Sequence, residues 1–485
     1  MGQIELKQLT RLKSGIDGLD VLLQGGFVAG ASYVIQGRPG SGKTILANQV
    51  AFNYVREGGR ALFATLLSES HERMFQFLST LSFFDHSMVG GDIQYLSAFD
   101  TMENEGLDQV VKLLRREITR QKASLLIVDG LLNARTKAET ALDTKRFIAE
   151  LQAHAAFAKC TVLFLTSSQL NDGSPELTMV DGVLDMREET KGVRSVRRIS
   201  LRKTRGSSAL TGLHEYEITD QGFVVYPRIE SVYNKPYLQE WLNERRVTSG
   251  VKPLDDMLGG GLPHTSISLL MGPSGCGKTT LGLHFMAQCT AEEPGVIFGF
   301  YETAEKLKSK AERIGLDFRT PMDAGVIKMV WQPTVELQLD RLGHQIINEV
   351  RRHQAKRVLI DSLGAIARLA MDQNRMVEFF TALTNELRSM DVTVYGTWEV
   401  RNIFGPDINA PSSELSSITD NLFLMRFAEL NAELKRVMSI VKVRDSDFDP
   451  TLREIVINNH GLDLTKAFRH AEMVLSGSPT SYDRT

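Results

Sequence analysis

Two stretches of the chain carry residues whose types and spacing could bind phosphate. Residues 37–44 read Gly-Arg-Pro-Gly-Ser-Gly-Lys-Thr, and residues 272–279 read Gly-Pro-Ser-Gly-Cys-Gly-Lys-Thr. Each follows a short apolar run and leads into a helix-like segment, which is the strand, loop and helix context that such a loop requires. Glycines let the backbone curl until several N–H groups converge on an anion at the start of a helix. The sequence therefore predicts two nucleotide sites, and a chance glycine-rich turn is a poor alternative for both.

The residue types within each loop predict a role in nucleotide binding for each of them. Lys43 and Lys278 are expected to reach the β- and γ-phosphates of ATP, and Thr44 and Thr279 to bind Mg²⁺ through their hydroxyls. The other residues expected to hold the nucleotide are Gly37, Pro39, Gly40, Ser41 and Gly42 in the first loop, and Gly272, Pro273, Ser274, Gly275, Cys276, Gly277 and Thr280 in the second.

Acidic residues that close apolar runs are the next candidates. The runs 125–129 and 358–362 carry Asp129 and Asp361 at their ends, a pattern typical of a central parallel strand whose acid holds Mg²⁺ through water. Glu69 and Glu302 follow the runs 61–65 and 295–300 and could orient a water or hydroxyl against the γ-phosphate. We predict catalytic roles for both glutamates together with the two loop lysines. The alternative is an acid that interacts with a helix dipole.

The segments around these residues alternate between helix and buried strand. Amphipathic or helix-like segments at 45–56, 107–121, 145–159, 337–353 and 375–390 alternate with apolar runs that include 161–166 and 392–396. This alternation predicts a parallel sheet with helices on both faces. The last third of each half, at 197–203, 214–218, 223–226, 435–443 and 453–457, alternates in polarity and predicts antiparallel strands.

An internal repeat sets the domain organisation. Ser14 to Asp20 recurs at 249–255 and Gly25-Gly26 recurs at 260–261, with the same offset that separates the two phosphate loops. A whole domain is therefore duplicated, as a chain of 485 residues allows. We predict a first domain at 1–233, a linker at 234–247, a second domain at 248–464, and at 465–485 a short helix near 466–475 followed by a mobile tail.

Composition limits the location and the partners. The net charge is -3 and 42% of the residues are hydrophobic, with no apolar run near the roughly 18 residues that a membrane span needs. The start lacks the apolar core of a secretory signal, and Cys160, Cys276 and Cys289 show no metal-ligand spacing. We expect a soluble cytoplasmic protein without a membrane partner.

One basic stretch could contact nucleic acid. Residues 187–205 hold many arginines, but few aromatic residues are interleaved to stack on bases. A solvated strand face, or a phosphate contact to a neighbouring subunit, is the favoured interpretation, and nucleic acid is not the expected partner.

With these motifs assembled, the chain resembles the KaiC family over essentially its whole length. This is a family of circadian-clock ATPases and autokinases with tandem RecA-like domains. The matching motifs are both phosphate loops, residues 16–20 with Gly25-Gly26, residues 203–206, residues 442–444, and residues 416–420 in the second copy. The resemblance implies a double-ring homo-hexamer with ATP between neighbouring subunits and a signalling partner similar to KaiB.

The resemblance also assigns residues. It implies that Lys203, Arg205, Lys442 and Arg444 reach the phosphates held by a neighbouring subunit, in the manner of an arginine finger. It further implies that Ser416 and Ser417 accept phosphate in the second domain. The family's paired glutamates correspond here to Tyr301-Glu302 in the second copy and to Leu67-Ser68-Glu69 in the first.

Three functions follow as hypotheses. The leading one is an oligomeric ATPase that hydrolyses ATP with Mg²⁺ at intersubunit sites in both domains, with serine autophosphorylation in the second, and acts in signalling or timing. The alternative is a nucleic-acid motor or recombinase of the RecA class, since the same core drives those reactions. The third is a nucleotide-binding scaffold with little turnover.

Overall fold

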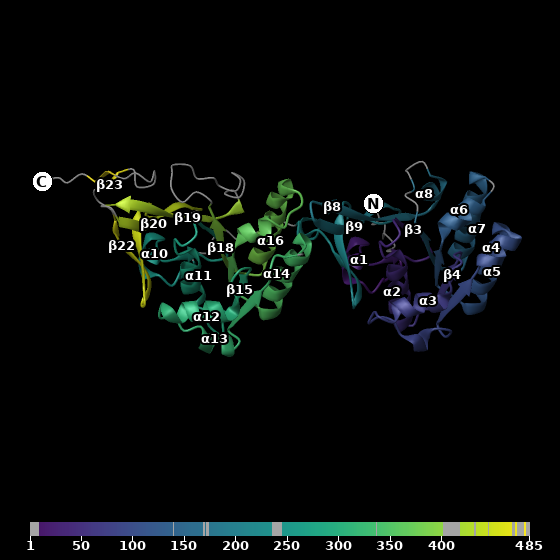
Figure 1. The fold of residues 1–485 in the computed structure, drawn as a ribbon, viewed down its shortest axis with the longest axis horizontal. Helices are drawn as coiled ribbons and strands as arrows, with labels where there is room; N and C mark the ends of the chain where they lie inside the picture. Colours follow the sequence, from purple (N-terminus) through teal and green to yellow (C-terminus); the bar gives the residue numbers. More distant parts are fainter. Residues whose placement is uncertain are drawn as a thin grey trace, which may run out of the picture. The chain divides into compact units, whose positions relative to one another are not determined.

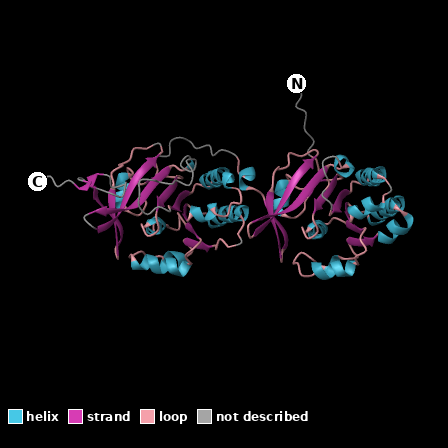
Figure 2. Cartoon of the chain, turned by 45° about the horizontal axis from the view of Figure 1, so that its top comes forward, coloured by secondary structure: helices cyan, strands magenta, loops and turns pink. Residues whose placement is uncertain are grey.

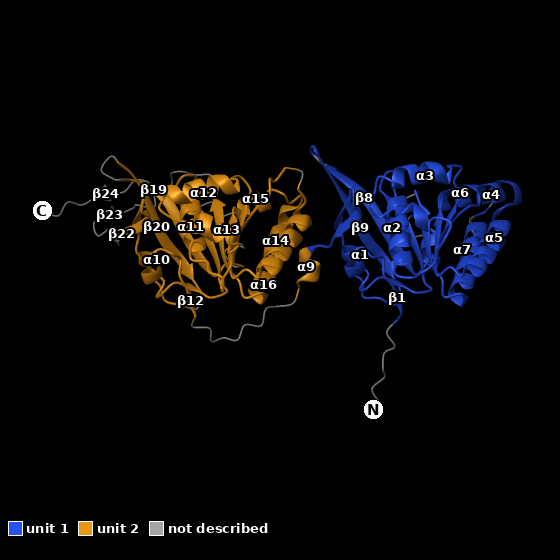
Figure 3. Cartoon of the chain, turned by 90° about the horizontal axis from the view of Figure 1, so that it is seen from below, with its two compact units in different colours: residues 1–228 blue, residues 229–485 orange. Residues whose placement is uncertain are grey.

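The chain forms two compact units, residues 1–228 and 229–485 (Figure 3). The computed structural model describes residues 9–138, 140–167, 170, 174–234, 245–335, 337–400, 418–430, 433–444, 446–467, 471–472 and 480–481. Each unit is built on a nine-stranded sheet. The predicted fold class, a mostly parallel sheet with an antiparallel C-terminal extension in each of two α/β domains, is confirmed.

The first unit has the strand order β5-β4-β6-β7-β3-β8-β9-β10-β11. Figure 1 labels β3, β4, β8 and β9 of this sheet. Its strands from β5 to β8 in this order pair in parallel, and β8 to β11 pair as antiparallel neighbours. The sheet strands are β3 (Ser32–Gly37), β4 (Ala61–Thr65), β5 (Ile93–Ser97), β6 (Leu125–Asp129), β7 (Thr161–Thr166), β8 (Gly182–Lys191), β9 (Arg194–Thr204), β10 (His214–Thr219) and β11 (Gly222–Tyr226). The helices are α1 (Asp17–Leu22), α2 (Lys43–Arg56), α3 (His71–Leu78), α4 (Phe99–Glu105), α5 (Leu107–Gln121), α6 (Leu131–Lys137), α7 (Ala141–Phe157) and α8 (Pro175–Met179), with the 3-10 turn η1 (His86–Met88) and the small pair β1 (Arg11–Leu12) and β2 (Phe27–Val28).

The second unit repeats this order as β16-β15-β17-β18-β14-β19-β20-β21-β22. Its sheet strands are β14 (Ile267–Gly272), β15 (Gly295–Gly299), β16 (Ile327–Trp331), β17 (Arg357–Asp361), β18 (Thr393–Glu399), β19 (Asn421–Leu430), β20 (Glu433–Val443), β21 (Arg453–Asn458) and β22 (Gly461–Ala467). The helices are α9 (Ile229–Val232), α10 (Lys252–Met257), α11 (Lys278–Met286), α12 (Ala304–Arg313), α13 (Arg319–Asp323), α14 (Leu339–His353), α15 (Leu363–Ala367) and α16 (Met376–Ser389), with η2 (Gln373–Arg375) and the short strands β12 (Arg246–Val247), β13 (Leu262–Pro263), β23 (Ala471–Glu472) and β24 (Thr480–Ser481).

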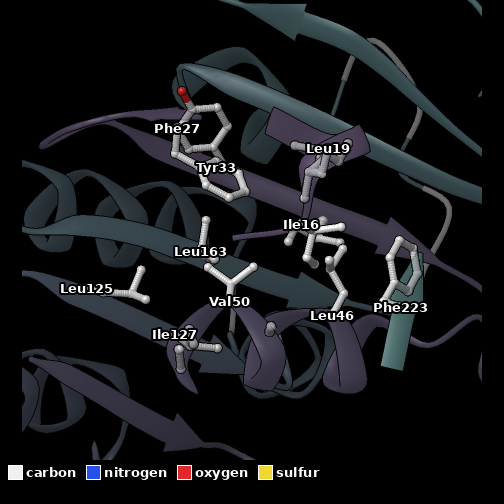
Figure 4. Close-up of a cluster of buried hydrophobic side chains, with 14 of the residues drawn as sticks. Ile16, Leu19, Phe27, Tyr33, Leu46, Val50, Leu125, Ile127, Leu163 and Phe223 are labelled. Atoms are coloured by element: carbon white, nitrogen blue, oxygen red, sulfur yellow. The ribbon is translucent and has the colours of Figure 1, made fainter. Parts of the chain in front are cut away.

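The parallel strands carry apolar residues on both faces, and helices therefore pack against both faces of the sheet. In the first unit, Phe63 and Ile127 face α2, while their neighbours Leu62 and Leu126 belong to a separate core under α5 and α7. Figure 4 shows Val50 of α2 beside Ile127 and Leu163 of the sheet. Helices pack around the strands of each sheet (Figure 2), so the carboxyl ends of the parallel strands, where loops meet, are left for a site.

The helix α9 belongs to the second unit although it lies before the predicted linker. Ile229 is fully buried in the core of that unit, and its N–H donates to Asp340 Oδ1 at 3.3 Å. Arg375 donates to Glu230 at 2.6 Å and to Asp340 at 2.5 Å. This buried cluster fixes α9 on α14 and α16, so the units divide between Arg228 and Ile229.

The helix predicted near residues 466–475 is wrong for the described residues. Lys466 and Ala467 continue β22, whose Leu462 and Leu464 are buried and alternate with polar residues, which is a strand pattern. Residues 471–472 pair with 480–481 as β23 and β24. Most of the predicted linker, 235–244, and most of the tail, 473–479 and 482–485, lie outside the described residues.

Two candidate nucleotide sites

The first phosphate loop joins β3 to α2 at the carboxyl edge of the sheet. Gly40 and Gly42 have φ of +82° and +91°, a backbone conformation that favours glycine. Lys43 Nζ donates to the carbonyls of Gly37 at 2.8 Å and Arg38 at 2.9 Å. The ammonium group is therefore held at the mouth of the loop, where backbone N–H groups and the start of α2 favour an anion.

The second loop repeats this geometry between β14 and α11. Gly275 and Gly277 have φ of +82° and +108°. Lys278 Nζ donates to the carbonyls of Gly272 at 2.8 Å and Pro273 at 2.7 Å. Cys276, which is buried, places its sulfur 3.9 Å from Lys278 Nζ, and Thr280 is buried in the first turn of α11.

Each loop threonine meets the strand-end aspartate of its own unit. Thr44 Oγ1 donates to Asp129 Oδ2 at 2.9 Å, and Thr279 Oγ1 donates to Asp361 Oδ2 at 2.7 Å. Burial raises the pKa of Asp129, an effect partly offset by the Thr44 hydrogen bond and by Lys43, and burial lowers the pKa of Lys43. Both groups are thus less easily charged alone than they would be beside a bound cation and phosphate.

These donors fit a magnesium ion. Hydroxyl and carboxylate oxygens are ligands that Mg²⁺ prefers, and substrate phosphates normally complete its shell. Among the described residues no three His, Cys, Asp or Glu side chains gather as a metal site, which such an ion does not require. Thr44 with Asp129, and Thr279 with Asp361, are the side chains that would hold it.

A cavity of about 380 Å³ opens beside the second loop. Glu302 lies in it with Oε1 3.4 Å from Lys310 Nζ, and its Oε2 is buried with no hydrogen-bond partner among the described residues. Tyr301 is 56% exposed, with the Arg368 guanidinium 5.8 Å from its ring centre. The lining residues include Ser274, Gly275, Gly277, Lys278, Thr279, Thr280, Tyr301, Glu302, Asp361, Thr397 and Arg436. The structure thus brings Glu302 into one cavity with the loop and its aspartate.

Glu69 of the first unit has different surroundings. Its side chain is 49% exposed and lies 3.5 Å from Arg73, one turn further along α3. The negative charge of Glu69 contributes to raising the pKa of Asp129. Glu69 is therefore near the first site but is paired on the solvent side.

The four cations assigned by resemblance lie far from the loops of their own units. Lys203 Nζ donates to the carbonyls of Leu177 and Thr178 at 2.9 and 3.1 Å, and Arg205 lies 3.6 Å from Asp181. Lys442 likewise donates to the Thr419 carbonyl at 2.9 Å, and Arg444 lies 3.8 Å from Asp420. The two pairs therefore have matching surroundings.

The strand register gives the reason for this separation. Thr204, between Lys203 and Arg205, pairs with Gly182, which pairs with Tyr33 at the start of β3. The loop follows Gly37 at the other end of that strand, about 13 Å away for four residues of extended chain. In the second unit Val443 pairs with Asn421, and Asn421 with Ser268, so the same holds there.

The sequence reasoning missed side chains that brace the loops from the antiparallel strands. Tyr216 of β10 donates its hydroxyl to the Ser41 carbonyl at 2.8 Å, and Arg436 of β20 donates to the Gly275 carbonyl at 3.1 Å. In the parallel part of the second sheet, Thr397 of β18 donates to the strand-end Asp361. The sequence carried one signal for Arg436. It precedes Lys442 at the same spacing at which Arg197 precedes Lys203 in the first copy.

Two further predictions concern the serine pair at 416–417 and the basic stretch at 187–205. Ser416 and Ser417 lie outside the described residues. Within the basic stretch, Arg187 pairs with Asp185 at 2.6 Å and Arg198 with Glu189 at 3.3 Å, as a salt-bridged strand face would. Over the part of the chain that is described, no helix has the length and apolar character to span a membrane.

Two α/β units with duplicated phosphate loops, strand-end aspartates and antiparallel extensions define a tandem RecA-like P-loop ATPase. The chain belongs to the KaiC family of ATPases, whose family model matches residues 12–230 and again residues 247–467.

Known relatives align over nearly the whole chain. The circadian clock oscillator protein KaiC of Picosynechococcus sp. is 26% identical over 489 residues, which cover 98% of this chain and 93% of the relative. The protein of the same name from Acaryochloris marina is 27% identical, covering 98% and 92%, and that from Synechococcus elongatus is 26% identical, covering 98% and 93%.

Proposed function

We propose that the chain is a hexameric ATPase that binds ATP with Mg²⁺ at two sites, each formed between neighbouring subunits, and hydrolyses it. The observation that carries this proposal is the set of side chains around the second cavity. Lys278 and Thr279 of α11, Asp361 of β17 and Glu302 between β15 and α12 line one space, so three different segments of the unit meet there. A cation for the phosphates, two oxygen donors for a metal and a carboxylate that can orient water are the parts that phosphoryl transfer requires.

The residues act in defined ways in this proposal. The loop N–H groups and Lys278 bind and orient the β- and γ-phosphates of ATP. Thr279 and Asp361 would hold Mg²⁺, which when bound neutralises charge on the phosphates. Glu302 Oε2, which is buried and has no partner among the residues that the structure describes, accepts a hydrogen bond from the attacking water and orients it. Lys43, Thr44 and Asp129 bind ATP and Mg²⁺ in the first unit.

Assembly into a ring is supported by the far position of the basic pairs. Lys203, Arg205, Lys442 and Arg444 stand at the opposite ends of the strands from their own loops, so they complete a site only when a neighbouring copy brings its loop to them. Cations supplied by a neighbour are a known device for stabilising charge in phosphoryl transfer. Membership of the KaiC family supports assembly as a double-ring hexamer.

Autophosphorylation and a signalling role complete the proposal. Ser416 or Ser417 accepts the γ-phosphate at the second site, with Glu302 taking the proton of the serine hydroxyl. The resulting change of charge, together with the nucleotide state, is read by a partner protein similar to KaiB. The relatives' names support a timing role, and Tyr301 in place of the first of two glutamates weighs against efficient transfer because a neutral phenol is a poor base.

The test separates this ATPase from a nucleic-acid motor. We expect slow ATP hydrolysis that single-stranded DNA does not stimulate, together with ATP-dependent assembly seen by light scattering. Stimulation by DNA that disappears as salt is raised would instead favour the motor. Tight ATP binding with no release of phosphate would favour a scaffold.

A further inference from the structure

We infer that Tyr216 is a positioning residue of the first nucleotide site: its hydroxyl holds one peptide of the phosphate loop in the orientation that binds phosphate. The inference rests on the proposed function and adds a residue that lies outside the loop and apart from the strand-end acids. It comes from one contact between the antiparallel extension and the loop, in which the hydroxyl of Tyr216 donates to the Ser41 carbonyl at 2.8 Å.

This contact fixes the direction of an N–H group. The carbonyl of Ser41 and the N–H of Gly42 belong to one planar trans peptide, so they point in opposite directions. A carbonyl that is held toward β10 therefore turns the Gly42 N–H away from β10. Gly277, which has the equivalent place in the second loop, lines the nucleotide cavity there. We therefore expect the Gly42 N–H to be one of the groups that donate to phosphate in the first loop.

A fixed peptide matters here because the loop depends on glycine. Gly40 and Gly42 both have positive φ, which allows the chain to curl around an anion. Glycine also gives the neighbouring peptides more rotational freedom than any other residue does. Ordering such a peptide when ATP binds lowers the affinity, and a hydrogen bond that orders it beforehand removes this cost.

The structure holds Tyr216 rigidly beside the loop. Its side chain is fully buried, and its ring stacks on Phe223 with the ring centroids 4.5 Å apart. At this residue β10 pairs with β9 on one side and with β11 on the other. The amide of Gln49 in α2 accepts from the N–H of Phe223 at 2.6 Å and donates to its carbonyl at 3.3 Å. The helix that follows the loop is therefore fastened to the same strands as Tyr216.

The Tyr216 hydroxyl is protonated at neutral pH. Burial raises the pKa of Tyr216, and the nearby charge of Arg197 opposes this effect only in part. A neutral phenol has one O–H to donate, and the Ser41 carbonyl accepts it.

The second unit holds its loop with a different side chain. Tyr216 faces Arg197 across the β9–β10 pair, and the equivalent cross-strand pair in the second unit is Arg436 with Ile455. There the arginine reaches the loop and donates to the Gly275 carbonyl at 3.1 Å, while the apolar side chain of Ile455 has nothing to donate. The Tyr216 hydroxyl therefore serves the first site, and its removal should affect one site of the two.

The test uses the full chain with the second site disabled. In the Lys278→Ala background, Tyr216→Phe keeps the aromatic ring and removes only the hydroxyl. We expect this variant to bind a labelled, non-hydrolysable ATP analogue with Mg²⁺ about tenfold more weakly, the loss typical of one hydrogen bond to a charged group. The number of sites should stay at one per chain. Equilibrium dialysis over a range of analogue concentrations gives both the affinity and the number.

Two controls separate positioning from a general weakening of the unit. Tyr226→Phe removes a hydroxyl from the neighbouring strand β11, where it donates to Glu217 at 3.3 Å, and should change neither the affinity nor the number of sites. In the Lys43→Ala background, which leaves the second site to be measured, Tyr216→Phe should not change the affinity.

Affinity and number of sites have different meanings in this experiment. Weaker binding with one site per chain supports the inference. Unchanged affinity, whether the number of sites stays or falls, or loss of every first site, would assign the hydroxyl to the fold alone and overturn the inference. If the Lys278→Ala chain that retains Tyr216 bound no analogue, the proposed function of the first site would fail instead.

Discussion

The hydroxyl of Thr44 donates to Oδ2 of Asp129 across 2.9 Å and so joins the start of α2 to the carboxyl end of β6. Residues that are distant in the sequence thereby form one oxygen-rich position at the sheet edge. The buried Asp129 there has a raised pKa, because burial penalises its charge more than Thr44 and Lys43 stabilise it.

Asp129→Asn should abolish Mg²⁺-dependent nucleotide binding at the first site without lowering the melting temperature of the nucleotide-free chain. An acid whose folded pKa is raised makes the fold less stable as pH rises from the unfolded to the folded pKa, because the unfolded state loses its proton first. Asn has no such penalty and can still accept from Thr44. Melting curves against pH check this: a lower melting temperature for the variant at neutral pH would contradict it.

Lys43→Ala and Lys278→Ala should each remove one of two bound nucleotides per chain. Each lysine serves its own loop, and the loops belong to separate units. Equilibrium dialysis with a labelled ATP analogue that is not hydrolysed gives the number bound. A single change that emptied both sites would show that the sites are strongly coupled or that one of them does not exist.

Arg205→Ala should weaken ATP-dependent assembly or lower turnover while the monomer stays folded. The side chain is 60% exposed and pairs with Asp181 at 3.6 Å, so its loss costs the isolated unit little. Arg116→Ala, an exposed arginine of α5, is the control. Light scattering with and without ATP gives the mass, and unchanged assembly and turnover in the Arg205 variant would remove the neighbouring-subunit role.

Ser416 or Ser417 should carry phosphate after incubation with ATP and Mg²⁺. The reason is their position before Ile418-Thr419-Asp420, together with a second site that has its lysine, threonine and both acids. Phosphopeptide mapping of the unaltered chain and of a Glu302→Gln variant measures it. If ATP is hydrolysed and neither serine is modified, the second unit is an ATPase only.

Arg375→Met should destabilise the second unit by about 3 to 5 kcal/mol, because it removes the cation that pairs with the buried carboxyl of Asp340 and the partly buried carboxyl of Glu230. Arg352→Met, whose arginine is 71% exposed and pairs with Glu349, should change stability by less than about 1 kcal/mol. Urea unfolding followed by the fluorescence of Trp331 and Trp398, which both belong to this unit, compares the two. Equal effects would contradict the role of the cluster.

Apolar runs made most of the fold predictable. A continuous run such as 125–129 is buried on both faces, and this requirement predicts a central parallel strand from the sequence alone. The helix predicted near 466–475 is wrong for the described residues there because Ala467 pairs with Arg453 of β21, a partner that local propensity does not reveal. Likewise α9 is too short for its periodicity to show which core it joins.

The site residues within the loops could be predicted from the sequence because their chemistry depends on spacing along the chain. The residues whose positions depend on strand pairing could not be predicted in this way. That Lys203 lies at the opposite end of β3 from its loop follows from the register of β8 and β9, and that Arg436 touches Gly275 follows from how far β20 extends past the loop.

The placement of α9 has a consequence for synthesis on the ribosome. The last sheet strand of the first unit, β11, ends at Tyr226, so that unit has all its strands when α9 emerges. Ile229 then has no core to enter, because Asp340, which caps it, is encoded 111 positions later. At ordinary translation rates this leaves α9 exposed for on the order of ten seconds beside a first unit that is free to fold. Nascent chains halted before Asp340 should therefore resist protease up to Arg228 and be cut within α9.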